Sequence, residues 1–462
     1  MKRSIFIILA VTLLFSSCGI YKKYERPDNI NTTGLFRDTA IVNGALPVTD
    51  TSSLGSTPWR EVFTDPYLRQ LIDSALLNNT DMLSASQSVI QAKTMLSTAK
   101  LAYFPTFTFA PTGTLRSWDF GKASQIYSLP VEASWSIDLF GSLTNAKRAQ
   151  QAILLQAQDY KRAVQCGIIS GIANMYYTLL MLDKQLEITK NTEQLTKKTY
   201  EMMVQQKQYA GTDESSVMSA KANYYSVLAS IPEIERQIRE VENALSVLLC
   251  EAPQQIQRGK LEDQVLPSKF GVGVPVEILS NRPDVHAKEM ALANCYYNVN
   301  MARSAFYPRL RISGSAAWTN NSGSGIVNPG KILSNAVASL TQPIFNNGQL
   351  VAGLKVAKSQ QEQAFLVWKQ AVLNAGSEVS NALTLYQSSQ KRSALEQTQI
   401  ESLERNVEVA EKMFKMSTNG NYLNVISAQQ ALLKAQLSKV ADDFNKMQAV
   451  VNLYYALGGG DK

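Results

Sequence analysis

YSLPVEASWSIDLFG, residues Tyr127–Gly141, alternates apolar and polar side chains along its length. The apolar series is Tyr127, Leu129, Val131, Ala133, Trp135, Ile137 and Leu139, and between them lie Ser128, Pro130, Glu132, Ser134, Ser136 and Asp138. Because successive side chains of a β-strand point to opposite faces, this pattern predicts a strand with one apolar and one polar face.

The sequence after this strand predicts a helix of unusual length. No proline occurs between Pro130 and Pro232, and residues 142–210 are rich in Ala, Gln, Lys, Leu and Ser, which favour helix. Roughly 70 helical residues extend about 100 Å at 1.5 Å per residue, which exceeds the core of a single globular domain. Such a helix is typical of a coiled coil, a bundle or the wall of a tube.

The chain contains two copies of this pattern. The matching segments are AYFPTFTFAPTGTL (102–115) with AFYPRLRISGSAAW (305–318), DLFGSLTNAKRAQQA (138–152) with PIFNNGQLVAGLKVA (343–357), and VMSAK (217–221) with VISAQ (425–429). Three matches in the same order, at an offset of about 205 residues, indicate an internal duplication. We therefore expect a first repeat over residues 58–260 and a second over 261–462.

Each repeat is expected to contain a helix, two strands, a very long helix and a further long helix. In the first repeat these are helix 66–102, strands 105–116 and 126–139, and helices 142–210 and 215–250. In the second they are helix 283–305, strands 308–318 and 333–345, and helices 347–416 and 422–457.

The strands have the length and the two-sided character of membrane strands. About ten residues, tilted, are enough to cross a bilayer. A soluble β-sandwich is the alternative, but it would need more strands and would not continue into such helices. Four strands cannot close a barrel alone, and open edges in lipid leave backbone groups unsatisfied. Copies must therefore share one barrel, and three copies, with about twelve strands, is the smallest number that leaves an open lumen.

One helical segment, residues 163–182, is apolar enough to resemble a transmembrane helix. Ser170, Asn174 and Thr178 form a polar stripe at helical spacing within it. The corresponding segment of the second repeat carries Lys369 and Glu378, which would be costly in lipid. We therefore expect both copies to pack against other helices.

The N-terminus has the pattern of an export signal. Lys2 and Arg3 precede an apolar run that ends at Phe15, and small residues and Cys18 follow. The sequence Ser16-Ser17-Cys18-Gly19 resembles a bacterial lipoprotein box, which predicts a signal peptide at 1–17, lipidation of Cys18 and an extended tether over 18–57. A plain signal peptide with an incidental cysteine is the alternative. One lipid chain anchors a protein to a membrane surface without spanning it.

The composition argues against catalysis and against nucleic-acid binding. The chain has 462 residues, a formal net charge of +7 and a single histidine, His286, so no histidine cluster is available. No phosphate-binding loop with a Lys-Ser ending is present, and we expect no enzyme activity, metal or cofactor. The remaining cysteines, Cys166, Cys250 and Cys295, are expected to be free thiols, and the terminal Gly458–Gly460 run is expected to free the tail.

Several motifs together resemble the outer-membrane efflux proteins of the TolC/OprM/NodT type. LSNRPDVHAKEMALANCYYNVNMARSAFYPRLRISG (279–314), WREVFTDPYLRQLIDSALLNNTDM (59–82) and LTQPIFNNGQL (340–350) carry the resemblance, which covers nearly the whole chain. The motif positions are Arg282, Pro283, Asp284, Phe306, Pro308, Pro343 and Phe345. We interpret Arg282-Pro283-Asp284 as a turn and helix start, and Phe306-Tyr307-Pro308 as a helix-to-barrel transition.

The resemblance implies an architecture and a set of partners. The fold class would be mostly α with a membrane β-barrel, in which long antiparallel helices of a homotrimer form an α-barrel and four strands per chain enter a shared barrel of twelve. The partners would be the outer-membrane lipid, a periplasmic adaptor (membrane fusion protein) and an inner-membrane RND-type pump. The chain would be lipid-anchored in the outer membrane, with a long periplasmic extension.

In this family the turn of the second repeat typically carries acidic residues that surround the closed entrance. Here Asn424 and Ser427 stand at those positions, which argues against an acidic gate at this turn. The turn of the first repeat carries Asp213 and Glu214, and we expect three copies of these charges to narrow the entrance and favour cations. The alternative is a solvated acidic pair at a helix turn.

The expected function is therefore transport without catalysis. The chain would form the exit duct of a tripartite efflux system that carries drugs or other small solutes. Type I protein secretion and metal-ion efflux are the alternatives within the same architecture. The 13 methionines are interpreted as not clustering at the turns, which disfavours a duct for metal ions.

Overall fold

The computed structural model describes residues 21–27, 54–117, 119–209, 213–267, 282–319, 332–416 and 422–460. The expected signal peptide, Cys18 and most of the expected tether lie outside these residues. The chain divides into two compact units, the first with residues 1–30, 87–158 and 287–370 and the second with 31–86, 159–286 and 371–462. Each unit combines segments of both sequence repeats, so the compact units and the repeats divide the chain differently.

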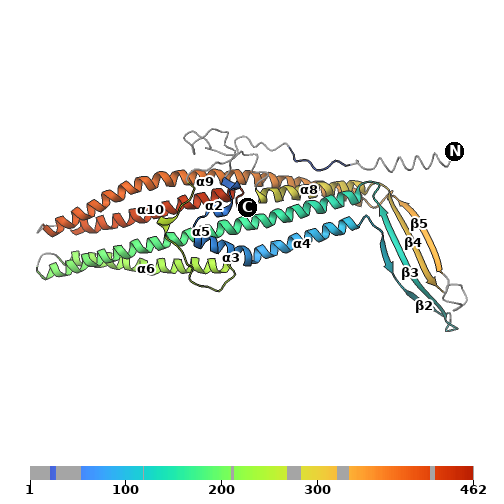
Figure 1. Cartoon of the computed structure of the whole chain (residues 1–462), viewed down its shortest axis with the longest axis horizontal. Coiled ribbons are helices and arrows are strands. Elements are labelled where there is room, and N and C mark those ends of the chain that lie inside the picture. Colours follow the sequence, from blue (N-terminus) through green and yellow to red (C-terminus); the bar gives the residue numbers. More distant parts are fainter. Residues whose placement is uncertain are drawn as a thin grey trace. The chain divides into compact units, whose positions relative to one another are not determined.

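The first unit contains an antiparallel sheet (Figure 1). Its strands are β1 (Thr106–Phe109), β2 (Thr112–Arg116), β3 (Ser124–Ile137), β4 (Arg309–Thr319) and β5 (Ile332–Thr341). Both β1 and β2 pair with β3, which pairs with β4, and β4 pairs with β5. The sheet therefore has four strand positions, with β1 and β2 end to end in the first.

The single strand expected over 105–116 is wrong in one respect, because the structure interrupts it. β1 ends at Phe109 and β2 begins at Thr112, with Ala110 and Pro111 between them. Proline has no backbone N–H to donate to a ladder, which accounts for the interruption. Ala110 N still donates to Pro130 O at 3.4 Å, so the chain stays beside β3 across the break.

The two faces of the sheet follow the sequence alternation. The register places Phe107 opposite Ala133 and Leu129 opposite Trp318 on one face. Phe107, Leu129 and Trp318 are 71%, 48% and 51% exposed. The apolar face is thus uncovered in the single chain. The other face carries mainly serine and threonine hydroxyls.

Aromatic and capping contacts connect the sheet to its helices within the first unit. Phe140, before helix α5 (Ser142–Gln208), stacks on Tyr307, with ring centroids 4.9 Å apart and planes at 14°. Asp138 accepts hydrogen bonds from Leu143 N and Thr144 N at 3.0 and 2.8 Å, which caps the start of α5. These contacts fix the transition from strand to helix.

Long helices make up the second unit and continue into the first. The principal helices are α3 (Pro66–Asn78), α4 (Thr80–Leu101), α5, α6 (Glu214–Leu248), α8 (Pro283–Ser304), α9 (Gln349–Met416) and α10 (Tyr422–Ala456). α5 has 67 residues and α9 has 68, so each extends about 100 Å. In the described part of the chain, no helix has an apolar stretch long enough to cross a membrane.

The expected single helix over 66–102 is wrong, because the structure divides it at Asn79. Asn79 Oδ1 accepts from Asp81 N and Met82 N at 2.9 and 3.2 Å, and so caps α4. Its Nδ2 donates to Leu248 O at 2.9 Å, at the end of α6. One buried amide therefore satisfies the ends of two helices, and this contact overrides the helical propensity of the surrounding sequence.

The prediction that the C-terminal glycines free the tail is also wrong. The structure buries Gly458, Gly459 and Gly460. A Cβ atom on Gly459 would lie 2.3 Å from the Tyr454 ring, and Gln165 Nε2 of α5 donates to Gly460 O at 2.8 Å. The glycines thus permit close packing of the C-terminal segment within the second unit rather than freeing it.

Candidate channel entrance

The first turn, between α5 and α6, presents the two acidic residues that the sequence selected. Asp213 is the N-cap of α6, and its carboxylate accepts from Ser216 N at 2.7 Å and from Ser216 Oγ at 3.1 Å. These hydrogen bonds hold the pKa of Asp213 below its ordinary value. Asp213 therefore stays ionised at neutral pH, and it also begins the helix.

Glu214, the next residue, is not a free charge. Its carboxylate forms an ion pair with Lys207 near the end of α5. The net contribution of Lys207, Asp213 and Glu214 is therefore one negative charge per chain rather than two. The electrostatic preference for cations that the sequence predicts at this turn rests mainly on Asp213.

The second turn, between α9 and α10, presents Asn424 and Ser427 on the first turns of α10. Both side chains line a cavity of about 780 Å³, together with Met413, Phe414 and Met416 of α9. The structure therefore places Asn424 and Ser427 in one groove without an acidic lining residue. Its charged lining residue is Lys412, which pairs with Glu408 at 2.5 Å. No hydrogen bond or ion pair between described residues connects them to Asp213 or Glu214.

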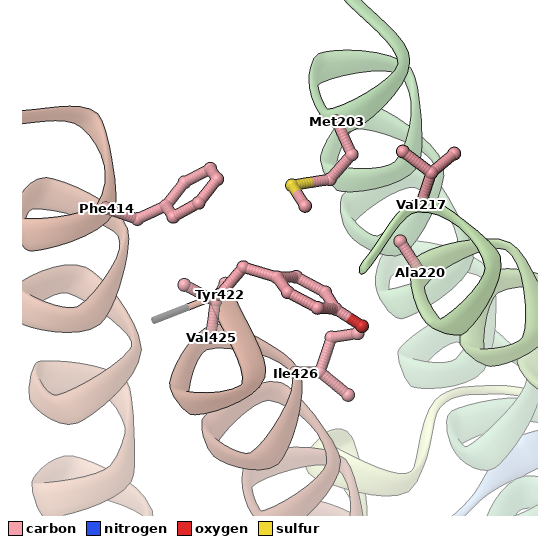
Figure 2. Close-up of a cluster of buried hydrophobic side chains, with 7 residues drawn as sticks. All are labelled: Met203, Val217, Ala220, Phe414, Tyr422, Val425 and Ile426. Atoms are coloured by element: carbon pink, nitrogen blue, oxygen red, sulfur yellow. The ribbon is translucent and has the colours of Figure 1, made fainter. Parts of the chain in front are cut away.

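A buried cluster joins the two helix hairpins just behind the turns. We refer to it as the hairpin cluster, and it consists of Met203, Val217, Ala220, Phe414, Tyr422, Val425 and Ile426. Figure 2 shows the side chains of all four helices pointing toward one another. Val217 and Val425 occupy matching places in the two sequence repeats, so the duplication brings equivalent residues to the same core. Burial of these apolar side chains holds the hairpins together.

A polar layer next to the hairpin cluster was missed by sequence reasoning. Gln429 Nε2 of α10 donates to Thr199 Oγ1 of α5 at 3.1 Å, and Gln430 Nε2 donates to Asn223 Oδ1 of α6 at 2.7 Å. The matched motif VISAQ ends at Gln429, so the sequence repeat did mark this position. The sequence alone does not show that Gln429 contacts Thr199, because the two residues are far apart in the chain.

The interpretation of the methionines is wrong. Met202, Met203, Met218, Met413 and Met416 lie on the helix ends that flank the two turns. Met203 is buried in the hairpin cluster, whereas Met413 and Met416 are 66% and 87% exposed. Five of the 13 methionines therefore flank the turns, although the sequence was interpreted as showing no cluster there. The methionines no longer argue against a duct for metal ions.

The family-motif residue Arg282 lies away from the turns and is 3% exposed as a side chain. Its guanidinium pairs with Asp284 and with Glu378 of α9, both at 2.6 Å, and donates to Ala456 O of α10 at 3.3 Å. Desolvation lowers the pKa of Arg282, but these partners outweigh it and the pKa is raised. α8 begins at Pro283, so Arg282 links this helix start to α9 and α10.

The remaining motif residues lie at the transitions between strands and helices. Phe306 and Pro308 occupy the connection between α8 and β4, and Pro343 and Phe345 the connection between β5 and α9. Phe345 is 82% exposed. These four residues belong to the first unit, whereas the turns of the candidate entrance belong to the second.

Comparisons with known proteins agree with this geometry. The profile described as outer membrane efflux protein matches residues 71–251 and 274–459. The chain is 25% identical over 457 residues to the cation efflux system protein CusC of Escherichia coli K12, covering 97% of this chain and 98% of CusC. It is 26% identical to the probable outer membrane lipoprotein SilC of Salmonella typhimurium, covering 88% and 89% of the two chains.

The fold is also that of a solved channel. The structure of the outer-membrane channel OprN superposes with a TM-score of 0.86 at 23% identity, covering 96% of this chain and all of that one. The profile match spans most of the chain and includes both repeats. The chain belongs to the outer membrane efflux protein family.

Proposed function

We propose that this chain is one subunit of a trimeric exit duct, lipid-anchored in the outer membrane, that carries small solutes out of the cell. The duct receives its solutes from an inner-membrane RND-type pump through a periplasmic adaptor. It is passive and has no catalytic activity. The observation that carries the proposal is the sheet. It has two faces of opposite polarity and, among the described strands, two unpaired edges, in a chain of the efflux family.

The unpaired edges support an assembly of several copies. β5 has β4 as its only partner among the described strands, and β1 and β2 have only β3. With the apolar face in lipid, unsatisfied backbone groups at these edges would be unfavourable. Pairing of β5 of one copy with β1 and β2 of the next satisfies both edges. Three copies give about twelve strand positions, enough to enclose a lumen.

Opening of the entrance requires no energy source within the chain. The hairpin cluster and the polar layer hold the two hairpins together near their turns. An adaptor that binds the separated hairpins more tightly than the closed ones shifts the equilibrium toward the open state. Solutes then diffuse along the polar interior.

A metal-ion duct is the second candidate. The exposed thioethers of Met413 and Met416 line the groove at the second turn, and thioethers prefer soft metal ions. The relative CusC is named a cation efflux protein. Under this reading the transported solutes are soft cations, and the rest of the duct is unchanged.

The test begins with the assembly. Outer-membrane extract run on a gel without heating is expected to show a heat-sensitive trimer, whereas a stable monomer would contradict the proposal. A deletion strain then separates the two candidates. Sensitivity to drugs favours the drug duct, and sensitivity to copper or silver salts alone favours the metal duct. Crosslinking followed by purification identifies the adaptor and the pump.

A further inference from the structure

The polar face of the sheet carries an arginine pair among small hydroxyl side chains. Arg309 and Arg311 are two residues apart on β4, so they lie on the same face. The register places Arg311 opposite Ser136 of β3 and Ser339 of β5, and Arg309 opposite Thr341. These short neighbours leave space around both guanidinium groups.

The orientation of Arg311 is fixed by a side-chain hydrogen bond. Its Nε donates to Ser134 Oγ of β3 at 2.7 Å, which holds the guanidinium along the polar face. Both arginines are exposed, and neither forms an ion pair with any residue in the described part of the chain. Their positive charges are therefore available to a solute.

The acidic residues near this pair offset only part of its charge. Glu132 of β3 lies on the same face, opposite Ser315. Asp138 directly follows Ile137, which pairs with Leu310, and it keeps its negative charge while it accepts hydrogen bonds from the start of α5. Glu132 is about 13 Å from this level, because Ser315 and Arg311 are four residues apart on β4. The two arginines against Asp138 therefore leave one net positive charge per chain at this level of the sheet.

We propose that Arg309 and Arg311 form an anion-selective ring in the duct, which favours small anions and solutes with carboxylate, phosphate or sulfonate groups. The inference rests on the proposed function, because three copies are needed to arrange the pairs around one lumen. Guanidinium groups bind such oxyanions through paired N–H donors. A lumen with walls of low dielectric concentrates counter-ions near fixed charges.

Ion selectivity in a planar bilayer tests the inference. The purified full-length protein, with a KCl gradient across the membrane, is compared with the double variant Arg309→Gln/Arg311→Gln. The chloride-to-potassium permeability ratio is expected to fall by about twofold or more in the double variant at low salt. The difference should shrink in concentrated salt, because fixed charges are screened over about 3 Å at 1 M.

The variant Arg309→Lys/Arg311→Lys is the matched control. It keeps both charges, so its permeability ratio should equal that of the wild type. Each arginine is also changed alone to glutamate, which alters the charge by the same two units per chain as the double glutamine variant. The ratio should therefore fall by a similar factor, and this test does not depend on the folding of the double variant. A double glutamine variant that conducts with an unchanged permeability ratio would contradict the proposed arginine ring but not the proposed duct. A wild-type protein that forms no conducting pore would contradict the duct itself.

Discussion

Gln430 of α10 donates a hydrogen bond to Asn223 of α6, with Nε2 and Oδ1 separated by 2.7 Å. The two residues are 207 positions apart and belong to different sequence repeats. Asn223 is buried, so its amide has little access to water. The contact therefore joins the two helix hairpins next to the hairpin cluster.

Replacing either amide should loosen the entrance. Asn223→Ala and Gln430→Ala are each expected to cost about 1 kcal/mol, and the double variant less than the sum, because both remove the same hydrogen bond. Single-channel recordings without partners should show more frequent opening in each variant, since the closed arrangement of the hairpins is weakened.

Gln237→Ala provides the control for this pair. Gln237 Nε2 donates to Glu233 Oε1 at 3.0 Å within α6 itself, so its loss leaves the contact between hairpins intact. Opening frequencies that do not differ among Asn223→Ala, Gln430→Ala and Gln237→Ala would show that the amide contact does not hold the entrance.

The strands and long helices were predictable because their signals are local and periodic. The alternation after Tyr127 gave the two faces of β3, and the proline-free stretch after Pro130 gave α5. The internal repeat added the second pair of long helices. These features depend on side-chain period and backbone chemistry, which a single sequence contains.

The errors arose where a distant contact determines the local structure. Asn79 ends one helix and begins the next because its amide also reaches Leu248 O. The sequence around Gly459 suggests a flexible residue, but the Tyr454 ring packs against it in the structure. The pairing of Glu214 with Lys207 likewise depends on how the turn folds back. Sequence pattern does not specify such distances.

The charges at the first turn should set part of the ion preference. Asp213→Asn removes the negative charge but keeps a side chain that caps a helix well. Its potassium-to-chloride permeability ratio in a planar bilayer is expected to fall. Lys207→Gln leaves the Glu214 charge uncompensated and should raise the ratio.

Asp213→Ala separates charge from capping. It removes the same charge as Asp213→Asn and also the cap of α6, at a cost of about 1 kcal/mol. Equal permeability ratios for these two variants, with lower thermal stability for alanine alone, would support both roles. If Asp213→Asn, Asp213→Ala and Lys207→Gln all keep the wild-type permeability ratio, the charges at the first turn do not determine the ion preference.

The packing of the C-terminal glycines gives a stability prediction. Gly459→Ala places a Cβ atom against the Tyr454 ring and is expected to destabilise the protein by about 1–3 kcal/mol. Gly167→Ala is the comparison, because its added Cβ meets no described atom within 4 Å outside its chain neighbours and the surrounding helix backbone. In the interior of α5 this change should stabilise by up to about 1 kcal/mol. Thermal unfolding in detergent measures both, and equal midpoints would contradict the packing.

Two acids on adjacent helices, Glu396 of α9 and Asp443 of α10, should respond to pH in opposite directions. Burial, together with the nearby carboxylate of Asp442, raises the pKa of Glu396 on α9. Asp443 is also desolvated, but hydrogen bonds from Lys439, Lys446 and Ser393 outweigh this and lower its pKa. Arg392 pairs with Asp442 at 3.0 Å and lies 3.6 Å from Glu396, so it only partly compensates the two acids.

The raised pKa of Glu396 means that the folded state binds its proton more tightly than the unfolded state does. Its contribution to stability is complete below the unfolded pKa of about 4.5 and is lost as pH rises through the folded pKa. Glu396→Gln should therefore raise the unfolding midpoint at neutral pH, with little effect in acid. The contribution of Asp443 to folding stability is present above its unfolded pKa and is lost as pH falls through its lowered folded pKa. Asp443→Asn should therefore lower the thermal unfolding midpoint at neutral pH. Midpoints in detergent between about pH 4 and pH 8 test both, and shifts of the same sign in the two variants would contradict the assignment.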